Sequence, residues 1–129
     1  MGYKFIDTNV FIEIFARKGI NSEKSIKLLK ENRDLMTTSL VISEIEWVLR
    51  SAYLLDRQVI SKYIGSVLSS DIIIENKKTL INTLNFYGAN LADWADCLNM
   101  FGLKEKNIST VYSYDRGLNI YKWIKRREP

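Results

Sequence analysis

The segment Tyr3–Asn9 constrains the fold of this chain more than any other part of the sequence. It is mostly apolar over its first four residues and then presents a carboxylate, a hydroxyl and an amide, Asp7, Thr8 and Asn9. Apolar residues at helical spacing follow, so residues from about 9 to 17 are predicted to form a helix. A buried strand that leads into a helix places Asp7 at the carboxyl end of the strand, where open α/β sheets bind ligands. Asp7 is therefore the first candidate ligand of a site.

Strand and helix patterns alternate along the rest of the chain. Short apolar or β-branched runs at residues 34–38, 72–74 and 108–112 are predicted strands, and the amphipathic segments between them are predicted helices. This alternation predicts the α/β class, with a central, mostly parallel sheet of four or five strands that helices cover on both faces. The tail at residues 120–127 is either a last edge strand or a short helix.

Length and composition predict one ordinary domain over residues 1–129. The 129 residues suit a single core, and no linker, repeat or low-complexity stretch divides them. No apolar run approaches the length of a membrane span, and the N-terminus lacks the pattern of a signal peptide. The single cysteine, Cys97, excludes an internal disulfide and fits a reducing cytoplasm, so we expect a cytoplasmic protein. Cys97 itself is predicted to be a small buried side chain rather than a nucleophile.

The sequence contains no histidine, and this absence excludes several kinds of site. The Ser-His-Asp triad, histidine general bases and nearly every zinc site of mixed histidine and cysteine type are ruled out. Any bound metal must therefore be held by oxygen atoms, which favours hard cations such as Mg²⁺ or Mn²⁺. The formal net charge of +4 permits a polyanionic partner without requiring one.

Three further carboxylates lie near the starts of predicted helices. Glu44 is predicted to fall on the flank of a buried helical stripe, whereas Glu46 and Arg50 are predicted to be exposed. Asp93 and Asp96 are three residues apart, so both are predicted to project from one face near a helix start. The packing stripe of that helix is predicted to be Leu91, Ala95, Leu98 and Gly102. A flank glutamate paired with a lysine, and a solvated acidic first turn, are the ordinary alternatives.

The predicted topology brings the carboxylates together. Right-handed crossovers place the carboxyl ends of parallel strands at one edge of a sheet. Asp7 and Asp115 each follow a predicted strand, and Glu44, Asp93 and Asp96 lie early in helices next to strands. Since clustered carboxylates raise one another's pKa and cost stability, five of them are best explained by divalent cations. A carboxylate-only magnesium site typically acts on phosphates.

The order of these motifs resembles the PIN-domain family, and specifically the small VapC-type toxins of toxin–antitoxin pairs. The matching segments are Phe5-Ile6-Asp7-Thr8-Asn9, Ser43-Glu44, Asp93-Trp94-Ala95-Asp96-Cys97-Leu98 and Ser113-Tyr114-Asp115-Arg116. They span nearly the whole chain with family-like spacing. Ser113 stands where the family usually has threonine, and residues 120–124 are a poor copy of its usual last strand.

The resemblance implies a three-layer α/β/α fold and a single-domain endoribonuclease. Such an enzyme depends on Mg²⁺ or Mn²⁺ and hydrolyses RNA phosphodiester bonds with a metal-activated water. The family also implies a homodimer, an RNA substrate and a small antitoxin whose C-terminal segment occupies a groove near the site.

The resemblance also assigns roles to individual residues. The catalytic, metal-binding acids are implied to be Asp7, Glu44, Asp96 and Asp115, with Asp93 as an additional metal ligand. The residues implied to orient these acids or contact a phosphate are Thr8, Asn9 and Ser113, and Arg116 is implied to contact RNA.

The sequence fits two other classes of function less well. A phosphatase or phosphotransfer domain with Asp7 as nucleophile is disfavoured, because no second aspartate follows two residues later. The sequence also lacks the common phosphate-binding glycine loops, which disfavours nucleotide-dependent enzymes. A PIN-like module that binds RNA or protein without cutting would have lost acids, and this chain retains them all. A PIN-domain nuclease that processes RNA outside a toxin–antitoxin pair stays open. The aromatic candidates for stacking on unpaired bases are Tyr53, Tyr63, Tyr87, Tyr112, Tyr114 and the three tryptophans, and more of them are expected to pack in the core than to contact RNA.

Overall fold

Five short strands form two parallel sheets in the computed structural model, which describes residues 2–129. β1 (Lys4–Phe5), β2 (Leu35–Thr37) and β3 (Ile73–Ile74) pair in the order β1-β2-β3. β4 (Thr110–Tyr112) and β5 (Lys125–Arg127) form a separate parallel pair. The expected α/β class with parallel strands is confirmed. The strands are divided between two sheets, however, and the last strand begins only at Lys125, beyond the segment 120–124.

Helices connect the strands in the expected alternation. The α-helices are α1 (Thr8–Ile12), α2 (Ile20–Glu31), α3 (Ser39–Ser51), α4 (Arg57–Leu68), α5 (Lys77–Ala89) and α6 (Trp94–Glu105). The first helix continues into a π-helical turn, η1 (Glu13–Arg17), so the predicted helix over residues 9–17 is present but changes its winding. A 3₁₀ helix, η2 (Arg116–Ile120), lies between β4 and β5.

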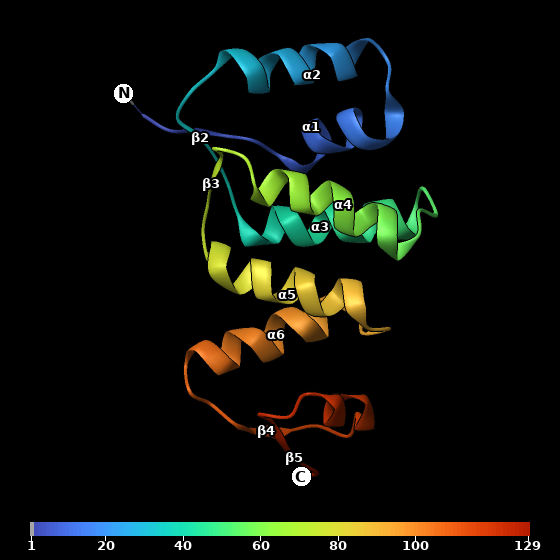
Figure 1. The fold of residues 1–129 in the computed structure, drawn as a ribbon, viewed down its shortest axis with the longest axis vertical. Helices are drawn as coiled ribbons and strands as arrows, with labels where there is room; N and C mark the ends of the chain where they lie inside the picture. Colours follow the sequence, from blue (N-terminus) through green and yellow to red (C-terminus); the bar gives the residue numbers. More distant parts are fainter. Residues whose placement is uncertain (1) are drawn as a thin grey trace.

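Along the longest axis of the molecule the helices follow in the order α2, α1, then α3 and α4 at a similar height, then α5 and α6 (Figure 1). α1 packs against α2 and α3, α3 against α4, α4 against α5, and α5 against α6. Figure 1 places the sheet of β1, β2 and β3 toward one end of this axis and the β4–β5 pair toward the other. The turn after β1 and the turn after β4 are therefore separated by the helical layers.

The core is formed largely by apolar side chains of α3, α4 and α6. In α6 the buried residues are Trp94, Cys97, Met100 and Phe101. The predicted stripe of this helix was wrong: Leu91 precedes the helix and is 97% exposed. The reason is that α6 begins only at Trp94, so the face of the helix that packs on α5 carries residues 94, 97 and 101. Cys97 is buried as predicted; its Sγ accepts a hydrogen bond from the Tyr121 hydroxyl at 3.2 Å, and burial raises the pKa of the thiol.

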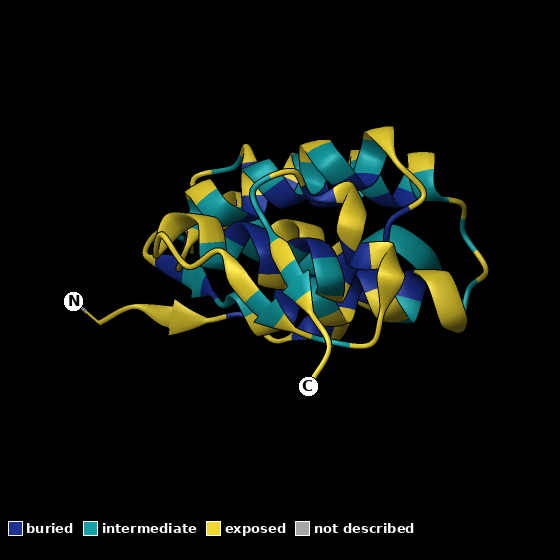
Figure 2. Ribbon diagram, turned by 90° about the horizontal axis from the view of Figure 1, so that it is seen from below, coloured by how far each residue is buried: buried dark blue, intermediate teal, exposed yellow. Residues whose placement is uncertain are grey.

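The short strands are exposed where they form sheet edges. Lys4 and Phe5 of β1 are both exposed, and this strand stands out beside the N-terminus in Figure 2. β1 is held to β2 by its backbone and by the buried Thr37 hydroxyl, which donates to the Ile6 carbonyl at 2.9 Å. Across residues 2–129, none of the helices combines the length and the apolar character that a membrane span needs.

Candidate active site

Asp7 lies at the carboxyl end of β1, as predicted. It is exposed, and its Oδ1 accepts a hydrogen bond from the Thr8 amide at 2.8 Å. The neighbouring Thr8 is buried, and its hydroxyl oxygen has no hydrogen-bond partner within residues 2–129. An unpaired buried hydroxyl costs free energy, so it marks a place where a bound group would find a ready partner. Asn9 is exposed and faces a hollow that it shares with Glu13 and Arg17.

Asp93, Asp96 and Asp115 form the acid cluster of this structure. The first two lie at the start of α6, and the third follows β4. Partial burial, together with the negative charges of Asp93 and Asp115, raises the pKa of the Asp96 carboxyl above its ordinary value of 3.8. The mutual repulsion shows that α6 and the β4–η2 turn bring these three acids within electrostatic range of one another.

Backbone amides fix two of these carboxylates and leave part of each one available. Asp93 caps α6, with Oδ2 accepting from the Asp96 amide at 3.1 Å. Asp115 caps η2, with Oδ1 accepting from the Gly117 amide at 2.8 Å. Ser113 stabilises the same turn because its hydroxyl accepts from the Asp115 amide at 3.0 Å. Capping accounts for an aspartate at each position, and the second carboxylate oxygen can still bind a cation.

Glu44 faces Asp93 across a surface hollow between α3 and α6. This hollow, of about 470 Å³, is lined by Ser43, Glu44, Glu46, Trp47, Arg50, Asp93, Trp94 and Ala95. The two helices are joined there by a hydrogen bond from Trp94 Nε1 to Ser43 Oγ at 2.9 Å. Glu44 is therefore an exposed carboxylate on the wall opposite the start of α6.

The predicted positions of Glu44 and Glu46 were wrong, because Glu44 is exposed and Glu46 is only 2% exposed. The reason is that α3 is covered on two sides. In addition to the predicted stripe, the ridge formed by Ile42 and Glu46, four residues apart, is buried. Glu46 Oε2 accepts hydrogen bonds from Arg50 Nε at 2.8 Å and from the Tyr87 hydroxyl at 2.9 Å. The spacing of Glu46 and Arg50, four residues apart, was the only sequence signal for this pair.

Arg57 is a further residue that the sequence did not single out. Its Nη1 donates to the carbonyl oxygens of Tyr87 at 3.0 Å and Ala92 at 2.7 Å, which lie near the end of α5 and in the loop between α5 and α6. The guanidinium also lies over the Tyr87 ring, 4.1 Å from its centroid. Arg57 thereby fixes the loop that leads directly into Asp93.

Replacement of Arg57 by methionine should destabilise the protein and loosen the start of α6. Methionine fills similar space but cannot donate to either carbonyl, and charge-assisted hydrogen bonds contribute about 2 kcal/mol each before relaxation. We expect a total loss of about 2–3 kcal/mol in the free energy of unfolding, measured by urea denaturation. Faster amide hydrogen exchange should be confined to residues 88–97. Lys62→Met on the exposed face of the same helix is the control, and an equal loss there would contradict this role.

Asp96→Asn should increase thermal stability at neutral pH while leaving it unchanged in acid. The folded protein raises the pKa of Asp96, so it binds this proton more tightly than the unfolded chain does. The charged carboxylate therefore costs stability above its pKa, and the cost disappears as the pH falls through the folded and then the unfolded value. The melting temperature of Asp96→Asn should exceed that of the native protein at pH 7, and the difference should shrink near pH 4. A difference in melting temperature that does not change with pH would contradict the raised pKa of Asp96.

The acids fit a hard divalent cation in chemistry but do not form a complete cage. Every candidate ligand is a carboxylate, the donor that Mg²⁺ and Mn²⁺ prefer. Within residues 2–129, no three Asp, Glu or Cys side chains are placed to hold one ion together. Mg²⁺ usually needs only one or two protein carboxylates, with waters and substrate phosphates completing its shell. The cluster of Asp93, Asp96 and Asp115 can supply that number.

The structure does not bring all five predicted acids to one sheet edge. Asp7 and Asp115 follow strands of different sheets. The edge that holds Asp7 instead carries Glu75 after β3, whose Oε1 accepts from the Ser39 amide and hydroxyl at 3.3 and 3.2 Å. Glu75 directly follows the triplet Ile72–Ile74, so the rule that identified Asp7 would have found it. Arg116 is exposed at the start of η2, beside Asp115.

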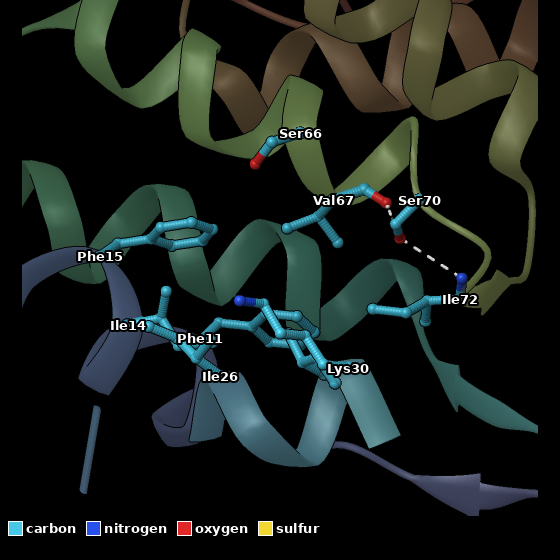
Figure 3. A pocket seen from close by; sticks show the side chains of 10 residues that line it. Phe11, Ile14, Phe15, Ile26, Lys30, Ser66, Val67, Ser70 and Ile72 are labelled. Carbon is cyan, nitrogen blue, oxygen red and sulfur yellow. Dashed lines mark hydrogen bonds between the residues drawn. The ribbon is translucent and has the colours of Figure 1, made fainter. Parts of the chain in front are cut away.

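A separate apolar hollow of about 260 Å³ lies between the first two helices and α4 (Figure 3). It is lined by Phe11, Ile14, Phe15, Ile26, Leu29, Lys30, Ser66, Val67, Ser70 and Ile72. The lining contains no carboxylate, so this hollow is not part of the acid site.

Comparison with known families now identifies the fold. The model of the PIN domain matches residues 4–123, which is nearly the whole chain. No curated protein matches the sequence. The two parallel sheets and their helices are consistent with the three-layer α/β/α arrangement of PIN-like domains, and PIN domains are generally metal-dependent nucleases. With a match over residues 4–123 and this architecture, the chain belongs to the PIN-domain family.

Proposed function

We propose that this chain is an endoribonuclease that depends on Mg²⁺ or Mn²⁺, and that it acts as the toxin of a VapC-type toxin–antitoxin pair. The observation that supports the chemistry best is the cluster of Asp93, Asp96 and Asp115, where partial burial and the two neighbouring negative charges raise the pKa of Asp96. Like charges are kept together at a cost to stability, and a divalent cation removes that cost. A chain without histidine has few other means to activate water.

The roles of the acids follow from how each one is held. Asp96, half-buried beside two other negative charges, gains most from a bound cation. Asp93 and Asp115 are fixed by backbone amides, so the second oxygen of each carboxylate can bind a cation without rearrangement. Glu44 and Asp7 are exposed carboxylates, and the family resemblance rather than a position beside the cluster assigns them to the catalytic set. The cation, when bound, neutralises charge on the phosphoryl group and lowers the pKa of a water.

The remaining residues position these acids or the substrate. The Ser113 hydroxyl holds the turn that presents Asp115. Thr8 carries an unpaired hydroxyl next to Asp7, which suits a water or a phosphate oxygen. Asn9 and Arg116 are both exposed, so each can contact RNA.

The proposed protein partner is an antitoxin, and the proposed assembly is a homodimer that acts in the cytoplasm on RNA. Support for a protein partner comes from the apolar hollow between α2 and α4 (Figure 3), where Ile26 is 37% exposed. An apolar segment of the antitoxin would cover this surface, which is separate from the acid site, and its C-terminal segment would occupy the groove near the acids that the family resemblance implies. Addition of the antitoxin is expected to stop cleavage.

The proposal is tested by incubating purified protein with total cellular RNA. Discrete cleavage is expected with Mg²⁺ or Mn²⁺, and none with a chelator. Asp7→Asn and Glu44→Gln preserve shape and remove charge, so both should lose the cutting. Cutting that persists in both variants would indicate a contaminating nuclease. A folded native protein that cuts no RNA with either metal would favour a binding module.

A further inference from the structure

The net positive charge of the chain comes from its C-terminal segment. Residues 116–129 contain five of the nineteen basic residues but only one of the fifteen acidic residues. This segment therefore accounts for the whole formal net charge of +4, and residues 1–115 are formally neutral. A segment with such an asymmetry attracts polyanions.

The register of β4 and β5 places basic and aromatic side chains on one face. Thr110 pairs with Lys125, and Tyr112 pairs with Arg127. Because residues two apart in a strand share a face, Tyr112, Lys125 and Arg127 lie on the same side of the pair. All three are exposed, and Tyr112 retains 67% of its surface. The strand that ends near the C-terminus is correspondingly coloured as exposed and intermediate in Figure 2.

The other face of the pair has a structural role. Arg126 donates from Nη1 to the Ser113 carbonyl at 2.9 Å and from Nε to Asn119 Oδ1 at 3.3 Å. It also lies 3.3 Å from the Glu128 carboxylate. Arg126 thus attaches β5 to the turn that carries Asp115, while Lys125 and Arg127 project to solvent.

Tyr114 extends the exposed face to the acid cluster. It is 71% exposed and lies between Ser113 and Asp115. Two exposed tyrosines, Tyr112 and Tyr114, therefore lead along the chain to a carboxylate of the proposed site. Large exposed aromatic rings beside cations are the features with which proteins bind unpaired nucleic-acid strands.

We propose that the β4–β5 face, defined as Tyr112, Tyr114, Lys125 and Arg127, binds a single-stranded segment of the RNA substrate. Bases stack on the two tyrosines, and the two cations neutralise the adjacent phosphates, so that the strand leads to Asp115. Paired RNA keeps its bases stacked inside the duplex and cannot use the tyrosines in this way. The placement of RNA here rests on the proposed nuclease function.

An RNA-binding assay under conditions that prevent cleavage tests the proposed RNA-binding face separately from the proposed nuclease function. Fluorescence anisotropy with a labelled oligouridine, and with a labelled RNA duplex, measures affinity in EDTA, where metal-dependent cutting is absent. The native protein should bind oligouridine more tightly than the duplex. Tyr112→Leu/Tyr114→Leu should bind oligouridine roughly tenfold more weakly, and Tyr112→Phe/Tyr114→Phe should retain affinity because phenylalanine also stacks.

The cations have a separate signature. Lys125→Gln/Arg127→Gln should bind more weakly and reduce the slope of log affinity against log salt by about 1.4, or about 0.7 for each lost phosphate contact. The matched controls are Tyr3→Leu, exposed just before β1, and Lys27→Gln/Lys62→Gln, exposed on α2 and α4. Circular dichroism verifies that each variant is folded.

Three results would overturn the proposed surface. These are equal weakening in the control variants, equal affinity for the duplex, or binding to anionic vesicles with none to RNA. A native protein that binds oligouridine through this face but cuts no RNA would refute the nuclease and leave the surface intact. If the native protein cuts RNA but substitution of the four residues changes neither binding nor cleavage, the proposed surface is refuted and the nuclease function stands.

Discussion

Asp96→Asn is expected to reduce RNA cleavage about 100-fold or more, because a catalytic cation contributes several kcal/mol of transition-state stabilisation. Asp96 is the half-buried member of the acid cluster, and its burial together with the charges of Asp93 and Asp115 raises its pKa. The amide of asparagine keeps the shape but loses the charge that would hold a divalent cation. The effect should lie in kcat, measured under saturating RNA, since Asp96 is not one of the residues of the β4–β5 face that would bind the RNA.

The control for this variant is Asp71→Asn, an exposed aspartate before β3. It makes the same chemical change outside the cluster and should leave cleavage unchanged. Asp96→Asn should also be at least as stable as the native protein at neutral pH, so loss of activity cannot be attributed to unfolding. An active Asp96→Asn enzyme would remove the cluster from the mechanism.

Glu46→Ala is expected to have the largest effect on stability, lowering the free energy of unfolding by about 3 kcal/mol. The Glu46 carboxylate is buried and accepts from both Arg50 and Tyr87. Without it, the hydroxyl of Tyr87 remains buried without that acceptor, and a cavity replaces the side chain. Arg50 is about half exposed and can turn to solvent, which limits the loss. The melting temperature should fall by roughly 10 °C.

Glu44→Ala is the matched control, since it removes the same side chain two residues earlier in α3. Glu44 is exposed, so its loss should change stability by less than about 0.5 kcal/mol while cleavage is lost. The pair of variants thus separates stability from activity within one helix. In a Tyr87→Phe background the cost of Glu46→Ala should decrease, because the unpaired hydroxyl is already absent. Equal stability losses for the two glutamates would contradict the buried network.

Local rules correctly predicted the parts of the fold that depend on short-range pattern. The alternation of apolar runs and amphipathic segments gave the α/β class, and Asp7 does follow a strand and precede a helix. Asp93 and Asp96 do lie at the start of a helix, as predicted.

Features that depend on tertiary contacts were not predictable from the sequence in the same way. The burial of Glu46 depends on Tyr87, which lies 41 residues later in the chain. The division of the strands into two sheets depends on how the helices pack, and the sequence of a short strand does not specify which strand it pairs with. Arg57 acts through backbone carbonyls, which any sequence offers, so its role had no sequence signal.

The most direct test of the central claim is a chelation and restoration experiment on one labelled RNA that the native protein cuts. EDTA should stop cleavage by the native protein, and titration with Mn²⁺ should restore it. Asp93→Asn should need a higher Mn²⁺ concentration for half-maximal restoration, because one ligand is lost, and Asp96→Asn should not be restored. Cleavage by the native protein in excess EDTA, or identical Mn²⁺ curves for the native protein and both variants, would contradict a metal-dependent nuclease at this cluster.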